Sequence, residues 1–523
     1  AEPPPKSASP RPNLHTSMLL SAGCALALLA SAWASEDTVA LLQTSLQVRG
    51  GTKQVLRSGA ADGPAGDAGG HYWPLARGRV GQYSQTSYSV PPEKLRNLSA
   101  SLAWTWVHPT NLSAFVWGTL IDEDRNIIIA AMQGVFKYTP DGELLWNRTD
   151  VTQLMMPSLM GNTLFGMEMN TAVMHALDLR TGATLWSRQE AKSTGQEGDM
   201  VEVHNGVVVA AVGQAAPPSP VGTPAQRAIG VNASNGQELW SYTPECGIWN
   251  IMALFPDEDT TIFMDFCGGL YRLGLYNGSQ IWKHAGSPES NTDGGAILGP
   301  DGSIYTCSNG PNAHWGEGVD PGRVRKYSLS EGALLWETKL PNACMNFPSV
   351  TFDGETVVLA DGQNVLDPPT KRVLGRPQEE IDRFYNFQRE LLRSKRQLSY
   401  YGYPDLNASI SGFDSRTGRL KWTHAVEPWY GLSFVNDEER AYNMVSGNGG
   451  IGHCGPPHWG GATIDLDGNI FIARSNGQLY IYNPITDTET TFHTGDGAMM
   501  AGVSFAPGMM VVPTCSWVYV FRF

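Results

Sequence analysis

Short apolar runs separated by glycine-containing turns recur along the chain from about residue 96 to its end. Residues 126–131 form a β-branched run, residues 135–138 form a second run, and residues 143–146 form a third that follows a glycine. Runs of about four to eight such residues, bounded by Gly, Asp, Asn or Ser, are typical of strands joined by tight hairpins. The pattern therefore predicts an all-β fold of many short antiparallel strands.

One unit of this pattern recurs with constant spacing: a polar turn residue, a glycine and, four positions later, a tryptophan. Because the glycine sits in a hairpin turn that needs a positive φ, the tryptophan falls on the strand that leaves the turn. Repeats of about 40 residues with four strands are typical of β-propeller blades, whose sheets stack face to face. We expect each tryptophan to lie on the outermost strand of a blade and to fill the wedge beside the next blade. The six units are Gly142/Trp146, Gly182/Trp186, Gly236/Trp240, Gly278/Trp282, Gly332/Trp336 and Gly418/Trp422.

Two further blades follow from the ends of the repeat region. Residues 469–492 repeat the strand pattern with Phe492 in place of the tryptophan. The C-terminal residues supply three strands without a fourth, whereas residues 101–106, which contain Trp104, resemble an outermost strand without a blade. Pairing these ends would leave no open sheet edge, so we predict an eight-bladed β-propeller of four-stranded antiparallel blades, closed by the N-terminal strand. Separate short-strand sandwiches are the alternative, but they do not require the recurrence. The C-terminal strands are expected over 501–505, 509–513 and 517–521.

The first 95 residues lack the repeat. An apolar run over 19–30 is followed by Ala32-Trp33-Ala34, the small-residue pattern of a signal-peptide cleavage site. We expect residues 1–34 to hold upstream residues and a signal peptide that is cut after Ala34. Residues 59–70 are rich in Gly, Ala and Asp, and we interpret residues 35–95 as a flexible linker or pro-segment. The propeller then spans 96–523, and we expect no transmembrane segment in the mature chain.

The composition narrows the class of protein further. The 523 residues are 41% hydrophobic and 16% charged, which is enough apolar material for a large core and excludes a disordered chain. Fifty acidic residues against 36 basic ones give a formal net charge of −14. A phosphate backbone would be repelled by this charge, so nucleic acid is not an expected partner.

Cysteines and asparagine sequons also indicate the secretory pathway. Six of the seven cysteines lie beyond the expected cleavage site, in a chain bound for an oxidising compartment. We predict the disulfide pairs Cys246–Cys267, Cys307–Cys344 and Cys454–Cys515. Six Asn-x-Ser/Thr sequences are consistent with a glycoprotein that is secreted or lumenal. These sequences begin at Asn97, Asn111, Asn147, Asn232, Asn277 and Asn407.

All the long insertions are predicted on one face of the disc. With the strands of a blade lettered A to D from the centre outward, the B–C and D–A connections emerge on one face and the A–B and C–D turns on the other. The long segments 307–322, 363–407 and 426–461 all belong to the first face. Within the insertion 363–407, residues 377–398 show helical spacing of apolar side chains after a proline. This helix either covers exposed apolar surface or serves as a docking or gating element.

Candidate ligand-binding residues lie in the same connections. The sequence His-Trp-Gly occurs at 314–316 and at 458–460, the second time beside His453 and Cys454. Histidine near cysteine can bind a transition metal, and tryptophan can stack on a planar ligand. The spacing matches no zinc pattern, so a disulfide-bonded loop is the alternative, and neither a metal site nor a catalytic residue is assigned. An aspartate that begins the innermost strand of the fifth blade is expected near the central channel. The candidates are Asp293, His314, Trp315, His453, His458 and Trp459.

The repeats resemble those of the quinoprotein alcohol dehydrogenase-like (PQQ-repeat) superfamily of eight-bladed β-propellers. The segments 178–186 and 414–422 fit best, because each combines an aspartate, a Thr-Gly turn and a tryptophan. The resemblance implies a fold and leaves the function open, since the superfamily includes quinone-dependent dehydrogenases, outer-membrane assembly scaffolds and stress-sensing lumenal domains.

Two functional classes are therefore compatible with the sequence. The first is an exported, non-catalytic propeller that binds a protein, glycan or small-molecule ligand through the B–C/D–A face and has no cofactor. The second is a dehydrogenase of alcohols or sugars that depends on PQQ and Ca²⁺. The resemblance implies adjacent disulfide-linked cysteines for such enzymes and, in some, a C-x-x-C-H haem motif, and the sequence has neither.

Overall fold

The ring is described by a computed structural model. It covers residues 70–108, 116–152, 154, 156–169, 171–194, 200–213, 225–287, 290, 292, 295–310, 322–344, 346–362, 379, 406–429, 435–436, 459–497 and 502–523. All of them belong to one compact unit, Gly63–Phe523. The helix expected over 377–398 lies outside the described residues, apart from residue 379. No helix in the described ranges has the length and apolar character needed to span a membrane.

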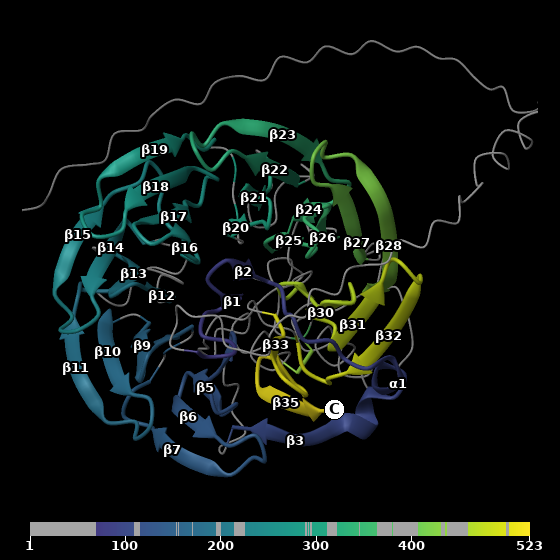
Figure 1. The fold of residues 1–523 in the computed structure, drawn as a ribbon, viewed down its shortest axis with the longest axis horizontal. Coiled ribbons are helices and arrows are strands. Elements are labelled where there is room, and N and C mark those ends of the chain that lie inside the picture. The colour runs from purple at the N-terminus through teal and green to yellow at the C-terminus, as the bar shows by residue number, and fades with distance from the viewer. Residues whose placement is uncertain are drawn as a thin grey trace, which may run out of the picture. The chain divides into compact units, whose positions relative to one another are not determined.

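Eight antiparallel sheets surround a central axis, each with strand A at the centre and strand D at the periphery (Figure 1). The predicted eight-bladed, all-β propeller is thereby confirmed. From strand A outward, blade 1 contains β4 (Thr119–Ile121), β5 (Ile127–Ala131), β6 (Gly134–Tyr138) and β7 (Leu144–Arg148); blade 2 contains β8 (Ser158–Met160), β9 (Thr163–Met167), β10 (Val173–Asp178) and β11 (Thr184–Gln189); blade 3 contains β12 (Val201–His204), β13 (Val207–Val212), β14 (Arg227–Asn232) and β15 (Glu238–Tyr242); blade 4 contains β16 (Leu254–Asp257), β17 (Thr260–Met264), β18 (Leu270–Gly274) and β19 (Gln280–His284).

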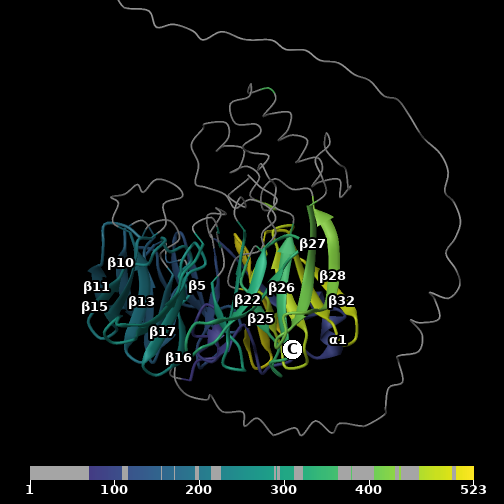
Figure 2. The same ribbon diagram turned by 90° about the horizontal axis from the view of Figure 1, so that it is seen from above.

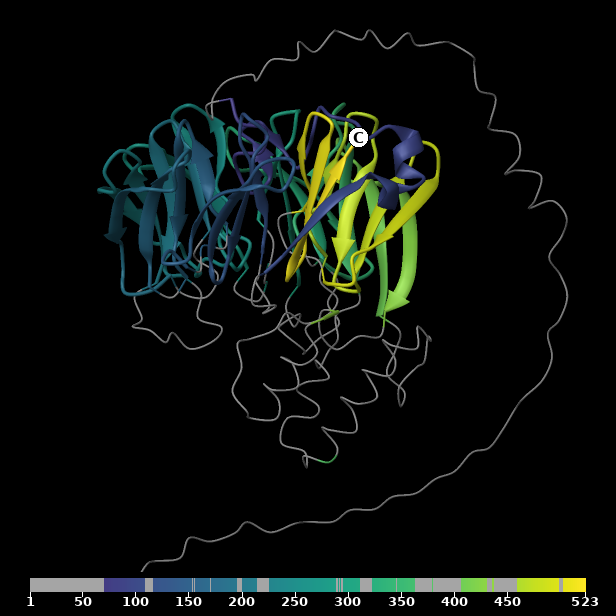
Figure 3. The same ribbon diagram turned by 90° about the horizontal axis from the view of Figure 1, so that it is seen from below.

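The second half of the ring repeats this order, with strand A of blade 6 divided into two short strands. Blade 5 contains β20 (Ile297–Leu298), β21 (Ile304–Ser308), β22 (Arg323–Tyr327) and β23 (Leu334–Lys339); blade 6 contains β24 (Ala343–Cys344), β25 (Ser349–Val350), β26 (Thr356–Gly362), β27 (Leu406–Asp414) and β28 (Leu420–Trp429); blade 7 contains β29 (Thr463–Ile464), β30 (Ile470–Arg474), β31 (Gln478–Asn483) and β32 (Thr488–His493); blade 8 contains β33 (Ser504–Ala506), β34 (Met509–Pro513), β35 (Trp517–Arg522) and β3 (Leu102–Val107). Seen edge-on, the blades stand side by side as a disc (Figures 2 and 3).

Blade 8 joins the two ends of the repeat region. Strand β3 pairs antiparallel with β35, with Thr105 opposite Tyr519 and Trp104 opposite Val520. Before β3, the short helix α1 (Pro92–Leu95) and the 3-10 turn η2 (Leu98–Ser101) bring the chain along the periphery to blade 8 (Figure 1). The predicted closure by an N-terminal strand is therefore confirmed, and every blade has its four layers of strand.

In six of the blades, a tryptophan on strand D connects the blade to the next one. Its side chain packs against the turn glycine of the following blade, and its indole N–H donates to a backbone carbonyl in the same turn. Trp422 and Phe492 occupy the equivalent places in blades 6 and 7, where their rings contact Tyr482 and Phe521. The six indole hydrogen bonds are Trp104 to Pro140 (3.0 Å), Trp146 to Leu179 (3.0 Å), Trp186 to Ala233 (2.9 Å), Trp240 to Leu275 (2.7 Å), Trp282 to Leu329 (3.0 Å) and Trp336 to Ser415 (2.9 Å).

The turn residue is glycine for two separate reasons: its backbone conformation and its contact with the indole ring. Gly236 has a φ of +73°, which side chains rarely adopt, and a Cβ built there would lie 2.8 Å from Cε3 of Trp186. Gly206, in the A–B turn of the same blade, has a φ of +83° but has no atom within 4 Å of such a Cβ. The two glycines therefore separate backbone strain from steric contact with the tryptophan.

Alanine at these positions should show the difference. We expect Gly206→Ala to lower the free energy of unfolding by about 1–2 kcal/mol through its left-handed backbone. Gly236→Ala should cost about 1–3 kcal/mol more, because the methyl group also collides with the indole. Chemical denaturation of both variants measures the two losses. Equal losses would show that the tryptophan contributes nothing to the choice of glycine.

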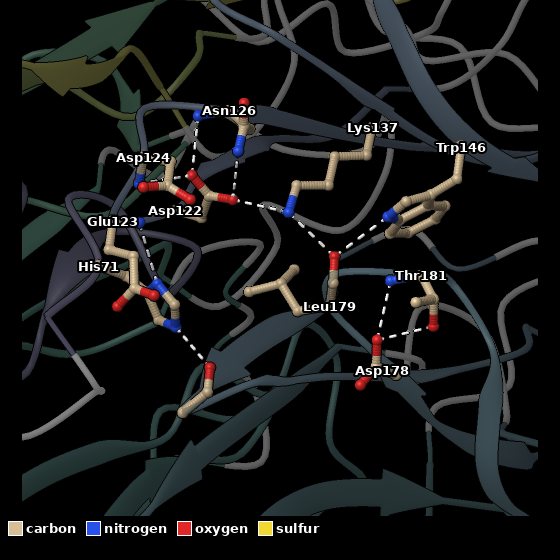
Figure 4. Close-up of polar contacts among 11 residues, drawn as sticks. His71, Asp122, Glu123, Asp124, Asn126, Lys137, Trp146, Asp178, Leu179 and Thr181 are labelled. Carbon is tan, nitrogen blue, oxygen red and sulfur yellow. Dashed lines mark hydrogen bonds and ion pairs between the residues drawn. The ribbon is translucent and has the colours of Figure 1, made fainter.

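Lysine–aspartate ion pairs in blades 1 and 5 reinforce the same carbonyls. In blade 1, Lys137 Nζ lies 2.7 Å from Asp122 Oδ2 and donates to Leu179 O of blade 2 at 2.9 Å (Figure 4). That carbonyl also accepts the indole hydrogen bond of Trp146. Blade 5 repeats the arrangement, because Lys326 pairs with Asp301 and donates to Ser415 O. A cation from strand C and an indole from strand D thus converge on one acceptor of the next blade.

Candidate functional site: the strap in the centre of the ring

Residues 71–90, called the strap below, run through the centre of the ring before the chain turns to α1. The strap contains the hairpin of β1 (Gly78–Arg79) and β2 (Gln82–Tyr83), which Figure 1 shows at the centre. At its start, Trp73 exchanges both backbone hydrogen bonds with Ile121 of β4, at 2.9 and 3.0 Å. The next residue, Pro74, accepts a hydrogen bond from Leu159 N of β8 at 2.8 Å. The strap is thus joined to the innermost strands of blades 1 and 2.

The second half of the strap is joined to three other blades. Tyr83 Oη accepts a hydrogen bond from Phe255 N of β16 at 2.9 Å. Gln85 Nε2 donates to Val350 O of β25. Ile464 of β29 donates to Ser84 O at 3.0 Å and accepts from Thr86 N at 2.9 Å. Blades 4, 6 and 7 therefore also hold the strap through their innermost strands.

This arrangement differs from the expectation of a flexible segment over 35–95. That expectation was based on the small residues at 59–70. The strap that follows them carries aromatic and aliphatic side chains. Trp73 is 2% exposed, Leu75 is 1% exposed and Tyr83 is 3% exposed. Burial of such side chains offsets the entropy of ordering the backbone. Residues 71–95 are accordingly an integral part of the propeller.

A histidine fixes the point where the strap enters the ring. His71 Nδ1 accepts a hydrogen bond from Glu123 N at 3.1 Å, so its Nε2 carries the proton and donates to Gly161 O at 2.7 Å (Figure 4). Burial lowers the pKa of His71, against the opposing effect of the Gly161 carbonyl and the nearby carboxylates. The neutral imidazole therefore bridges the A–B turns of blades 1 and 2.

Arg77 places a guanidinium group at the centre of the ring, where it is 2% exposed. Its Nη1 donates to Ala296 O at 2.7 Å, and its Nε and Nη2 lie 3.0 and 2.8 Å from Met252 Sδ. The guanidinium carbon lies 3.3 Å from the centroid of the Phe347 ring. Burial lowers the pKa of Arg77 to about 9, so the group is still a cation at neutral pH. It is held by a carbonyl, a thioether and an aromatic face.

Glu202 lies beside the strap on β12 and is 3% exposed. Its carboxyl group takes part in a hydrogen bond with the backbone of Ala76, while Oε2 has no hydrogen-bond partner. Burial raises the pKa of Glu202 to about 8, although the charge of Arg77 opposes the change. The side chain is therefore mainly a neutral acid at pH 7.

The charge of Glu202 should appear in the pH dependence of stability. In the unfolded chain this acid ionises near pH 4.5, but in the folded ring it ionises near pH 8, beside Arg77 and Tyr83. Between these values the folded state holds the extra proton, so its contribution to stability falls as the pH rises. We compare the free energy of unfolding of Glu202→Gln with that of the parent protein. The difference should shift in favour of the variant, by on the order of a few kcal/mol, as the pH rises from 5 to 8.5. Unfolding of both proteins at the two pH values tests this, and a difference independent of pH would contradict it.

Five of the six candidate ligand-binding residues predicted from the sequence cannot be placed relative to the strap. Asp293, His314, Trp315, His453 and His458 lie outside the described residues. Their proposed role remains a prediction.

Trp459 is described, and it lies in the core between blades 6 and 7, 1% exposed. Its indole N–H donates to Asp361 O at 3.2 Å, and its ring contacts Tyr480 and lies 5.2 Å from the guanidinium carbon of Arg474. The indole of Trp459, on which the sequence pattern predicts that a planar ligand stacks, is therefore buried against other side chains of the protein.

Two of the three expected disulfides are present. Cys246 is bonded to Cys267, and Cys307 is bonded to Cys344. The first joins the D–A connection before blade 4 to the B–C connection of blade 4, and the second joins β21 of blade 5 to β24 of blade 6. The third expected pair includes Cys454, which lies outside the described residues, while Cys515 is buried.

At the described centre of the ring, Arg77 and Glu202 are both buried. Calcium requires several oxygen ligands, and among the described residues no group of three or more His, Cys, Asp or Glu side chains is placed to hold a metal ion. Glu202 is mainly protonated at neutral pH, and Arg77, the cation at this place, already donates to the chain itself.

Comparison with known proteins gives the class of fold. Residues 139–245 match the family described as outer membrane protein assembly factor BamB, a PQQ-repeat family, and this segment runs from the C–D turn of blade 1 to the end of blade 3. No curated protein matches the chain. The predicted resemblance to PQQ-repeat propellers is therefore confirmed, and the protein is an eight-bladed β-propeller with repeats of this type.

Solved structures agree with this class at low sequence identity. BamB from Moraxella catarrhalis superposes with a TM-score of 0.50 and 12% identity, over 81% of this chain and 97% of that one. Quinohemoprotein alcohol dehydrogenases from Comamonas testosteroni and Pseudomonas putida each give a TM-score of 0.55, with 13% and 10% identity, over 86% of this chain and 80% of theirs. At these identities the likeness concerns the fold alone.

Proposed function

We propose that the chain is an exported propeller that acts as a binding or scaffold module through its B–C/D–A face, without catalysis. The observation that carries this proposal is the strap, because its buried residues fill the centre of the ring and Arg77 donates to the Ala296 carbonyl there. The match of residues 139–245 to an assembly-factor family supports a scaffold role. Export is supported by the apolar run before Ala34 and by the two disulfides.

The proposed face is set by the ends of the strands. Strand β21 ends at Ser308, β26 ends at Gly362 and β28 ends at Trp429, and the longest connections leave the ring from these ends. On the other face, the C–D turns are tight glycine hairpins that already receive the indole rings. The B–C/D–A face therefore has the chain length needed to form a binding surface.

Photo-crosslinking in the secretory pathway of an expressing cell tests the binding face. A crosslinking amino acid is placed at Thr171, in the B–C turn of blade 2, or at Glu331, in the C–D turn of blade 5, and both positions are exposed. We expect a discrete adduct from position 171 and none from position 331. Adducts from position 331 alone, or from neither position, would contradict the proposed face.

A second measurement tests whether the chain is a quinone-dependent dehydrogenase. The purified full chain is incubated with PQQ and Ca²⁺, and dye reduction is followed with alcohols and aldoses. We expect no rate above the protein-free control and no quinone absorbance after gel filtration. Stoichiometric retention of the quinone together with substrate-dependent dye reduction would replace the binding module by a dehydrogenase.

A further inference from the structure

The residues around Arg77 form a site for its guanidinium group, and none of them belongs to the strap. The walls come from residues that precede innermost strands: Met252 before β16, Gly295 and Ala296 before β20, and Phe347 before β25. These segments belong to three consecutive blades and meet at the centre of the ring around one side chain. Their arrangement does not depend on the repeat unit, which lies on the outer strands.

Each wall matches a different part of a guanidinium group. The Phe347 ring faces the guanidinium carbon at 3.3 Å and so contacts its flat surface. The Ala296 carbonyl and the Met252 sulfur accept from nitrogens at its edge. A planar, weakly hydrated cation can stack and donate at the same time, whereas a compact ammonium ion remains strongly hydrated and presents no flat face.

Gly295 makes room for the group. A Cβ built on Gly295 would lie 2.8 Å from Arg77 Nη2, and the next contact, to Met252 Cβ, would be 3.4 Å. The residue is therefore small where the guanidinium edge passes it. A methyl group at this position would occupy the space of the cation while scarcely touching the remaining walls.

We propose that the centre of the ring is a guanidinium-binding site, lined by Phe347, Met252, Gly295 and Ala296, which Arg77 of the strap fills as an intramolecular ligand. The ligand class of the site is an alkylguanidinium ion, the end group of an arginine side chain. In the intact protein the site holds the strap at its turning point. This proposal stands apart from the proposed binding face and does not depend on it.

Arg77→Ala removes the ligand and leaves the walls in place, so an added guanidinium ion should bind there. We expect the variant to unfold at a lower temperature than the parent protein. Ethylguanidinium, at up to about 50 mM, should raise its Tm saturably by at least about 2 °C. Ethylammonium at the same ionic strength should give no such rise, and the parent protein should respond to neither ion. If the variant does not accumulate folded, its refolding yield with each of the two ions is the readout, and the same preference is expected.

Two matched variants separate the site from a general effect of the ion. Arg79→Ala removes the neighbouring strap arginine, whose guanidinium lies 5.7 Å from the Tyr72 ring, and should show no response to ethylguanidinium. Gly295→Ala should lower the Tm of the parent protein, because it displaces Arg77. In the Arg77→Ala background it should leave the Tm nearly unchanged and abolish the ethylguanidinium response. An equal response to ethylammonium, a response of the Arg79→Ala protein, or a response that survives Gly295→Ala would overturn the proposal.

Discussion

Replacing Trp240 by alanine is expected to lower the free energy of unfolding by about 3–5 kcal/mol. The indole is 6% exposed and packs on the turn glycine of blade 4, where a Cβ on Gly278 would lie 2.8 Å from it. Its N–H donates to Leu275 O at 2.7 Å. The substitution therefore removes a large buried ring and leaves the wedge between blades 3 and 4 without its filling. Chemical denaturation of the variant measures the loss.

Leu185→Ala is the matched control for this prediction. Leu185 lies on the outermost strand of blade 2, directly before a repeat tryptophan, and is 55% exposed. Surface substitutions of this kind change stability by about 0.5 kcal/mol. If Trp240→Ala and Leu185→Ala had the same effect, the tryptophans would not be what holds the blades together.

A similar loss, again about 3–5 kcal/mol, is expected for Trp73→Ala in the strap. The Trp73 side chain lies in the apolar core shared by blades 1, 7 and 8, and its ring faces Phe505 of β33. Its backbone hydrogen bonds to Ile121 do not require the side chain, so the substitution isolates the packing. Denaturation gives the loss, and limited proteolysis should detect faster cleavage within residues 72–90 of the variant.

Tyr88→Ala provides the comparison within the strap. Tyr88 is half-buried and meets Tyr72 edge to face, with ring centroids 6.0 Å apart. It contributes less buried area than Trp73, so we expect a smaller loss and little change in the rate of cleavage. Equal proteolysis of both variants and the parent protein would mean that the strap is not held by its buried side chains.

The ring could be predicted from the sequence because its determinants are local. A turn glycine, a tryptophan four residues later and the alternating strands around them lie within one blade, and the same set recurs, as at Gly182 and Gly418. The closure followed from a count of strands, since blade 8 lacked one and β3 had no blade of its own. The disulfides Cys246–Cys267 and Cys307–Cys344 join neighbours in the chain, with sequence separations of 21 and 37, and blade order made these pairs the natural choice.

The strap and its site could not be predicted in the same way. Their contacts join distant positions, as in the hydrogen bonds of Arg77 to Met252 and of Gln85 to Val350, so no spacing within the strap reports them. The available signal was the group of apolar residues before Arg77, which includes a tryptophan and a leucine, but the glycine-rich stretch at 59–70 dominates the composition of this region. Glu202 alternates with valines on β12 and so resembles a solvent-facing strand residue. The strap covers that face, and this depends on the tertiary structure alone.

The pairing of β3 with β35 is the feature on which the ring depends, and cysteine crosslinking tests it directly. Thr105 lies opposite Tyr519, whereas Val520 is one residue further along and points to the other face of the sheet. In the full chain, Thr105→Cys combined with Tyr519→Cys should form an oxidative crosslink that joins the two peptides in a proteolytic map. Thr105→Cys combined with Val520→Cys should not. No crosslink in the first protein, or equal crosslinking in both, would contradict the closed eight-bladed ring.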